Sequence, residues 1–202
     1  MHILCIESEL IMNEILSFRV GEPIYFSGQS GPAFKVLSGS VRLDRVLHDG
    51  HPTFANLAIA GDLIGAEVLL NQFYGFEAHA LTDCELVQWQ EPSYLWVESF
   101  AKELIKVSQR KTDAVSLRCG TAMERILKLI ELIRQEPTDE AKIILPRLKD
   151  AAEITDLTIE TVSRCISSLR KSGTLVPIKG QTGNLRSQFN VCIPAVEQMA
   201  MQ

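Results

Sequence analysis

The N-terminal part of the chain consists of short β-type apolar runs with glycines between them. The runs, which lie between about Phe18 and Gln90, are Ile24–Phe26, Phe34–Leu37, Val41–Leu43 and Leu86–Trp89. The glycines that separate or follow them are Gly21, Gly28, Gly31, Gly39, Gly50, Gly61, Gly65 and Gly75. Many short strands with turn residues at this frequency predict a β-sandwich or a rolled barrel.

A helical pattern follows between Pro92 and Gln135. This segment has no internal proline and a single glycine, Gly120, and its apolar residues recur at helical spacing. We predict a long helix to about Cys119, a break at Gly120 and a second helix to about Arg134. The apolar stripe of the long helix needs a surface to pack on. A second copy of the chain is the favoured partner, and the β-rich part of the same chain is the alternative.

The C-terminal part combines two short helices with short strands. After a predicted turn at 136–139, residues 143–145 favour a strand and Leu148–Ile154 favour a helix. A tight turn at 155–157 leads to Thr158, a good N-cap, and the helix that it opens ends before Ser172–Gly173. Strands are expected at 174–178 and 189–193, around a loop with Gly180 and Gly183. This order predicts a winged helix-turn-helix.

The helix that begins at Thr158 carries residue types suited to reading DNA bases. Its exposed face is expected to hold Ile159, Glu160, Ser163 and Arg164, whereas Val162, Ile166 and Leu169 lie on the opposite, apolar side. Arginine can bind guanine through two hydrogen bonds, glutamate can accept from cytosine, and serine or isoleucine can approach a thymine methyl group. The candidate phosphate contacts are Thr158, Thr161, Lys179 and Arg186. The alternative is an ordinary surface helix with a Glu160–Arg164 ion pair.

The charge distribution agrees with a DNA-binding C-terminal part. The chain as a whole carries −5, yet Lys142 to Val191 contains eight basic and four acidic residues. An acidic body with a basic module is typical of selective DNA contact by one domain. The sequence has no apolar stretch long enough to span a membrane and no basic N-terminal leader, so we expect a cytoplasmic protein. Five scattered cysteines, none in a CxxC pair, favour neither a disulfide framework nor a local metal clip.

Five ordered motifs resemble the cyclic-AMP receptor protein / fumarate–nitrate regulator (CRP/FNR) family of transcription regulators. The segments are Gly21–Phe26 (GEPIYF), Val36–Leu43 (VLSGSVRL), Ala60–Glu67 (AGDLIGAE), Ala80–Leu86 (ALTDCEL) and Glu160–Arg164 (ETVSR). The resemblance covers nearly the whole chain after Phe18. It implies an α+β protein with a double-stranded β-helix (jelly-roll) sensor domain at 1–98, a dimerisation helix at 99–120 and a winged helix-turn-helix at 121–202.

The resemblance also implies a function and partners. The ETVSR segment is similar to the fumarate–nitrate branch, in which Glu, Ser and Arg read a TTGAT-type half-site. The expected protein is therefore a homodimer that binds two-fold symmetric double-stranded DNA. Activation through RNA polymerase is the expected role, because it is the commoner one in the family. No catalytic residues and no metal site are expected.

The sequence departs from the family where effectors bind. Cyclic-nucleotide binders have an arginine for the phosphate, but here Tyr74 or Gly75 stands near that place, so cyclic AMP is not expected. Glu67 persists, and Glu67 and Tyr74 are interpreted as candidate pocket residues; alternatively, Glu67 is an acceptor for backbone amides. Only Cys5 lies near the N-terminus, which argues against the iron–sulfur branch. The four histidines, each more typical of a surface or satisfied residue than of a haem ligand, are His2, His48, His51 and His79.

Other effectors stay open. Arg110 and Lys111, together with Gln109, could face a small anionic metabolite, although a solvated helix face is the competing interpretation. Regulation by abundance alone, without an effector, is a further alternative. Cys165 lies beside Arg164, so its oxidation could act as a redox brake on DNA binding.

Two functions from other classes compete with the regulator. A cupin-like enzyme would need two or three histidines and a carboxylate converging on one metal, but His48 and His51 flank a predicted hairpin turn and no HxH occurs. A β-barrel binding module whose helical tail contacts protein would show no salt-dependent DNA affinity.

Overall fold

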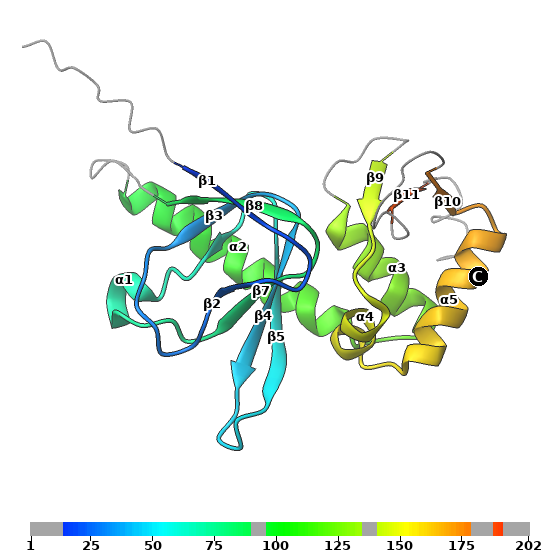
Figure 1. Ribbon diagram of the computed structural model, residues 1–202, viewed down its shortest axis with the longest axis horizontal. Coiled ribbons are helices and arrows are strands. Elements are labelled where there is room, and N and C mark those ends of the chain that lie inside the picture. The colour runs from blue at the N-terminus through cyan, green and yellow to red at the C-terminus, as the bar shows by residue number, and fades with distance from the viewer. Residues whose placement is uncertain (1–13, 90–95, 135–140, 179–187, 192–202) are drawn as a thin grey trace, which may run out of the picture.

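Two antiparallel four-stranded sheets form the N-terminal part of the protein (Figure 1). The computed structural model describes residues 14–89, 96–134, 141–178 and 188–191. One sheet has the strand order β1-β8-β3-β6 and the other has the order β2-β7-β4-β5. The strands are β1 Ile15–Phe18, β2 Pro23–Tyr25, β3 Phe34–Ser38, β4 Ser40–Val46, β5 Pro52–Ile59, β6 Leu63–Ile64, β7 Glu77–Ala80 and β8 Cys84–Gln88.

The alternation of side chains along the strands builds the core between the two sheets. In β3, Phe34 and Val36 are buried while Lys35 and Leu37 are exposed, because successive side chains of a strand point to opposite faces. Val36 and Leu86 from one sheet and Val41 from the other are all 0 % exposed. The predicted rolled β-structure is confirmed, and we call this part, residues 15–88, the β-roll.

Some elements of the β-roll have no clear signature in the sequence. The short helix α1, Val68–Asn71, lies between β6 and β7 and ends at Gln72 in the left-handed conformation.

The predicted turn between His48 and His51 is the β4–β5 hairpin, where Gly50 has a φ of +81°. A left-handed residue in a tight turn suits glycine, which has no Cβ to clash.

A long helix leads from the β-roll to the C-terminal part. Helix α2 spans Trp96–Ser116, and α3 spans Ala122–Ile133. Helix α2 ends slightly before Cys119, where the sequence predicted its end. The backbone N–H groups of Arg118 and Cys119 donate to carbonyls three residues earlier instead of four, and Gly120 has a φ of +94°. Thr121 then caps α3 in a reciprocal capping box with Glu124. The break at Gly120 is where the sequence placed it.

The C-terminal part packs three helices beside a small antiparallel sheet. Its sheet has the order β10-β11-β9, and helix α4 is joined to α5 by a turn at 156–158. The elements are β9 Ala141–Ile144, α4 Leu148–Thr155, α5 Ile159–Lys171, β10 Leu175–Pro177 and β11 Gln188–Val191. The predicted turn at 136–139 lies outside the described residues.

One apolar core connects the two parts of the protein. Ile154, Val162 and Leu169, from α4 and α5, are 0 % exposed. The same cluster includes Leu117 beyond α2 and Phe54 of the β-roll. Within the described residues, every helix is too short or too polar to cross a lipid bilayer.

Candidate nucleic-acid interface and ligand cavity

The N-terminus of α5 is fixed by its capping threonine. Thr158 has extended backbone angles, and its Oγ1 accepts a hydrogen bond of 3.2 Å from the backbone N–H of Thr161. The two threonine hydroxyls lie 3.0 Å apart. This cap satisfies one free amide of the first turn and sets the direction in which the helix leaves the turn. The predicted phosphate contacts Thr158 and Thr161 therefore lie together at the start of α5.

The two faces of α5 have different environments. Val162 and Leu169 are fully buried, whereas Glu160 and Arg164 are exposed, Ser163 is half-buried and Ile159 is 46 % exposed. The apolar face holds the helix in the core, so its backbone cannot rotate without losing that burial. The four candidate base-reading residues all remain at least partly accessible on the outside of α5.

The charged groups of this exposed face are available to a partner. Arg164 Nε donates to the backbone carbonyl of Glu160 at 3.4 Å, and in the described part of the chain no carboxylate lies within 4.0 Å of its guanidinium. The alternative Glu160–Arg164 ion pair is therefore absent from this structure. The pKa of Glu160 is lowered by its own backbone N–H, by the Thr158 hydroxyl and by Arg164, which keeps the side chain a hydrogen-bond acceptor.

Basic residues at the C-terminal end of α5 were not singled out as contacts in the sequence. Ser167, Arg170, Lys171 and Pro177 line an open hollow between α5 and β10. The Arg170 guanidinium lies 5.9 Å from the centre of the Phe189 ring. Two basic residues in the last turn of the helix were the available signal. The other two expected phosphate contacts, Lys179 and Arg186, lie outside the described residues.

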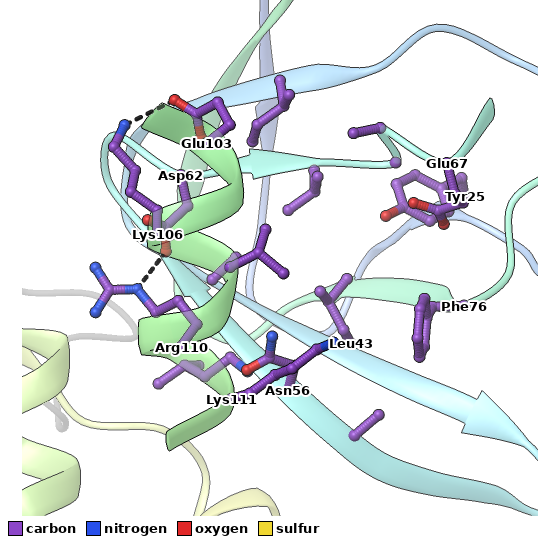
Figure 2. Close-up of a pocket in the computed structure, with 18 residues that line it drawn as sticks. Tyr25, Leu43, Asn56, Asp62, Glu67, Phe76, Glu103, Lys106, Arg110 and Lys111 are labelled. Atoms are coloured by element: carbon purple, nitrogen blue, oxygen red, sulfur yellow. Dashed lines mark hydrogen bonds and ion pairs between the residues drawn. The ribbon is translucent and has the colours of Figure 1, made fainter. Parts of the chain in front are cut away.

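A cavity of about 240 Å³ lies between the β-roll and α2. Figure 2 shows Glu67 beside Tyr25 at the end away from α2, with Glu103, Lys106 and Arg110 on the opposite side. Its apolar lining residues are Leu43, Ala55, Leu57, Ala58, Leu63, Ile64, Ala66, Phe76 and Val107. A mainly apolar lining with a few charged groups is typical of a ligand site, and the volume suits a molecule smaller than a typical drug.

Three of the four expected effector-pocket residues line this cavity. Glu67, Arg110 and Lys111 do so, but Tyr74 does not. Tyr74 is 4 % exposed, and its ring stacks on Tyr25 with 3.8 Å between the ring centres. Its hydroxyl donates to the Pro32 carbonyl at 2.7 Å. Tyr74 is thus a core residue behind the cavity wall, which corrects its expected position.

Most of the cavity's charges are neutralised within the protein. Arg110 donates to Asp62 at 2.7 Å and to Asp113 at 2.9 Å, and Lys106 binds Glu103 at 2.8 Å. Glu67 accepts from the Gly75 backbone N–H at 3.1 Å, as expected for an acceptor of backbone amides. Among the described ion pairs, none involves Lys111. Arg110 is therefore a structural cation, whereas the Lys111 ammonium group is available to bind a ligand in the cavity.

Cysteine and histidine positions bear on the remaining expectations. Cys165 is 8 % exposed and lies with Val162 and Leu169 in the core, and burial raises the pKa of its thiol, although Arg164 opposes the shift. A buried thiol is protonated and unreactive, so the expected redox brake at the DNA-facing side loses its geometric basis. The ring of His79 meets Phe26 edge-on. In the residues described, no group of three or more His, Cys, Asp or Glu side chains is arranged around a possible metal position.

Comparison with known proteins shows which domain and which regulators this chain resembles. The sequence model of the cyclic nucleotide-binding domain matches residues 15–96. The nitrogen fixation regulation protein FixK of Azorhizobium caulinodans is 29 % identical over 161 residues, which are 70 % of this chain and 62 % of that protein. This chain thus spans less than two thirds of the length of that FixK.

Two solved structures share the architecture over nearly the whole chain. FixK2 of Bradyrhizobium japonicum is 25 % identical with a TM-score of 0.63, covering 92 % of this chain and 96 % of its own. A transcriptional regulator of the CRP/FNR family from Thermus thermophilus is 23 % identical with a TM-score of 0.64, covering 94 % and 99 %. The chain contains a cyclic-nucleotide-binding-like domain, and over nearly its whole length it is similar to regulators of the CRP/FNR family.

Proposed function

We propose that this protein is a sequence-specific DNA-binding transcription regulator that acts as a homodimer. In this proposal residues 1–98 are the sensor domain, 99–120 the dimerisation helix and 121–202 a winged helix-turn-helix. The observation that carries it is the exposed face of α5. Glu160 and Arg164 stand there on a helix that is fixed in the core, and no carboxylate of the described chain lies within 4.0 Å of the Arg164 guanidinium.

The chemistry of this face matches base reading in a major groove. The Arg164 guanidinium can donate two parallel hydrogen bonds to guanine, and the ionised Glu160 can accept from a cytosine amine. Ser163 and Ile159 are accessible for base edges or a thymine methyl group. Thr158 and Thr161, with Lys179, Arg186 and the hollow at Arg170, supply contacts to phosphates. The proposed target contains TTGAT-type half-sites, and the proposed role is activation through RNA polymerase.

The outer face of α2 supports the homodimer. Ile105, Ser108, Thr112 and Val115 are all exposed and follow one another at spacings of three, four and three residues. Ile105 is 72 % exposed and Val115 is 66 % exposed, although both are aliphatic. This spacing forms one stripe along a helix and suits packing against a second helix of the same kind. We call these four residues the α2 stripe. Two α5 helices held by such a dimer would read half-sites about 34 Å apart.

The cavity is the proposed place for an effector, if the protein has one. Its apolar lining and the available Lys111 suit a small, mainly apolar molecule with one acidic group. Cyclic AMP fits poorly, because Arg110 is already bound to Asp62 and Asp113. Native mass spectrometry of protein purified from its own host would reveal such a molecule.

The direct test of DNA reading compares Arg164→Ala with Lys179→Ala. The probe is a duplex with two inverted TTGAT half-sites, and a random duplex of equal length is the reference. Arg164→Ala is expected to weaken binding to the palindrome by roughly 1–3 kcal/mol and to relax specificity, with a smaller effect on random DNA. Lys179→Ala should weaken both duplexes alike and reduce the salt dependence.

Two results would contradict this proposal. Equal losses on both duplexes for Arg164→Ala would rule out its base-reading role. Wild-type protein that binds neither duplex at low ionic strength would favour the alternative of a binding module whose helices contact protein.

A further inference from the structure

Helix α4 contacts the β-roll directly at its N-terminal end and through Arg118, just after α2, at its C-terminal end. At its N-terminal end, Arg147 Nη2 donates to the Val20 carbonyl at 2.8 Å. The guanidinium lies so close to Gly21 that a Cβ there would be 2.7 Å from Nη1, and Gly21 itself has a φ of +84°. At the C-terminal end, Arg118 donates to the carbonyls of Glu153 and Ile154, each at 3.3 Å. Arg118 also lies 5.5 Å from the centre of the Phe54 ring of β5.

The middle of α4 is attached through a buried arginine of the β-roll. Arg42, on β4, is 8 % exposed and pairs with Asp44 beside it at 2.8 Å. Its Nη1 reaches Glu153 at 2.6 Å and Asp150 at 3.4 Å, and both of these carboxylates belong to α4. A half-buried arginine cluster of this kind is more directional than an exposed pair, because several hydrogen bonds fix one orientation. We call the contacts of Arg42, Arg118 and Arg147 with α4 and the β-roll the α4 clamp.

The covalent connection alone would hold the C-terminal part loosely. The chain passes from α2 to α3 through residues 117–121, where Gly120 has a φ of +94°. Such a short non-helical link permits rotation unless side chains oppose it. The apolar contacts of Leu117 and Phe54 bring the parts together, and the clamp adds polar contacts that fix the angle.

We infer that the α4 clamp sets the angle of the reading helix α5 relative to α2, and that Asp150 and Glu153 are positioning residues for binding two-fold symmetric DNA. This inference rests on the proposed function. A dimer gains affinity for a palindrome because the second half-site binds at a high effective concentration. That gain is greatest when both α5 helices are already held at the spacing and angle of the two half-sites. A single half-site needs no such alignment.

The variant that tests the clamp is Asp150→Asn/Glu153→Gln. It removes both α4 carboxylates from Arg42 but keeps the buried Arg42–Asp44 pair, so the β-roll core is retained. The matched control is Asp156→Asn/Glu131→Gln, which makes the same two chemical changes at exposed positions of the C-terminal part. Because both variants lose two negative charges, their general attraction to DNA rises alike.

The readout is the ratio of affinities for an inverted pair of TTGAT half-sites and for a single half-site. We expect this ratio to fall about tenfold in the clamp variant and to change less than about twofold in the control. Inserting two base pairs between the half-sites should weaken wild-type binding strongly and the clamp variant weakly. An unchanged ratio in the clamp variant overturns the inference.

A second measurement needs no DNA. In scanning calorimetry the wild-type protein should unfold in one transition, and the clamp variant in two, with the C-terminal part unfolding first. A single transition in the clamp variant overturns the inference. If wild-type protein binds no duplex, the proposed function fails, and calorimetry still decides whether the clamp couples the two parts.

Discussion

The β-roll with helix α2, on one side, and helix α5, on the other, use arginine in opposite ways. Arg42 of the β-roll and Arg110 of α2 each contact two or more carboxylates at distances between 2.6 and 3.4 Å. On α5, Arg164 contacts a backbone carbonyl at 3.4 Å and no carboxylate of the described chain within 4.0 Å. The same guanidinium group thus holds the fold together in one region and is presented to solvent in the other. Residue type alone does not reveal a binding role, because the surrounding charges decide it.

The largest effect that separates the two regions is expected from Arg110→Gln. The substitution leaves Asp62, which is 5 % exposed, without its cation, although the Ile59 N–H still donates to it. We expect a loss of about 3 kcal/mol in the free energy of unfolding, measured by urea denaturation. The matched change Arg164→Gln should alter it by less than about 0.5 kcal/mol, because that side chain is exposed. Equal losses would show that the two arginines do not differ in this way.

A smaller effect is expected on the assembly when the α2 stripe is charged. Ile105→Glu places a carboxylate in the proposed helix–helix contact, while the 72 % exposed position leaves the isolated fold intact. The dimer dissociation constant should rise at least roughly 30-fold, about 2 kcal/mol, in sedimentation equilibrium. Leu70→Glu, at a 78 % exposed position on α1, is the control and should leave the dimer unchanged. A dimer that tolerates Ile105→Glu would exclude this face as the contact.

The smallest effect is expected at the cap of α5. Thr158→Ala removes the acceptor for the Thr161 N–H and should lower the free energy of unfolding by about 1 kcal/mol. Thr158→Ser retains a hydroxyl and should keep most of the wild-type free energy of unfolding. DNA affinity should fall in Thr158→Ala on palindromic and random duplexes alike, since a cap and phosphate contact carries no base specificity. Loss on the palindrome only would contradict that assignment.

Local signals in the sequence predicted much of the fold. Thr158 as a cap and Ser172–Gly173 as a stop placed the ends of α5, and Gly120 marked the end of the helical segment before α3. The burial of Cys165 also had a signal in the sequence. This residue lies three residues after Val162 and four before Leu169, which is the spacing of the buried face.

Long-range contacts could not be predicted in this way. Arg42 and Asp150 are 108 positions apart, so no periodicity joins them. The stacking of Tyr74 on Tyr25 likewise depends on how β2 and the segment after α1 meet in space. Its position in the motif put Tyr74 near the place of the family's phosphate-binding arginine. Only the assembled sheets show that its hydroxyl donates a hydrogen bond to the Pro32 carbonyl.

The two faces of helix α2 connect the cavity to the proposed dimer contact. Its inner side forms a wall of the cavity through Glu103, Lys106 and Arg110, and its outer side presents Ile105 and Val115. In a symmetric dimer, a molecule that binds in one cavity would displace a helix, α2, that also packs against the other subunit. Occupancy of the first site would therefore change affinity at the second, and titration curves would depart from a simple hyperbola.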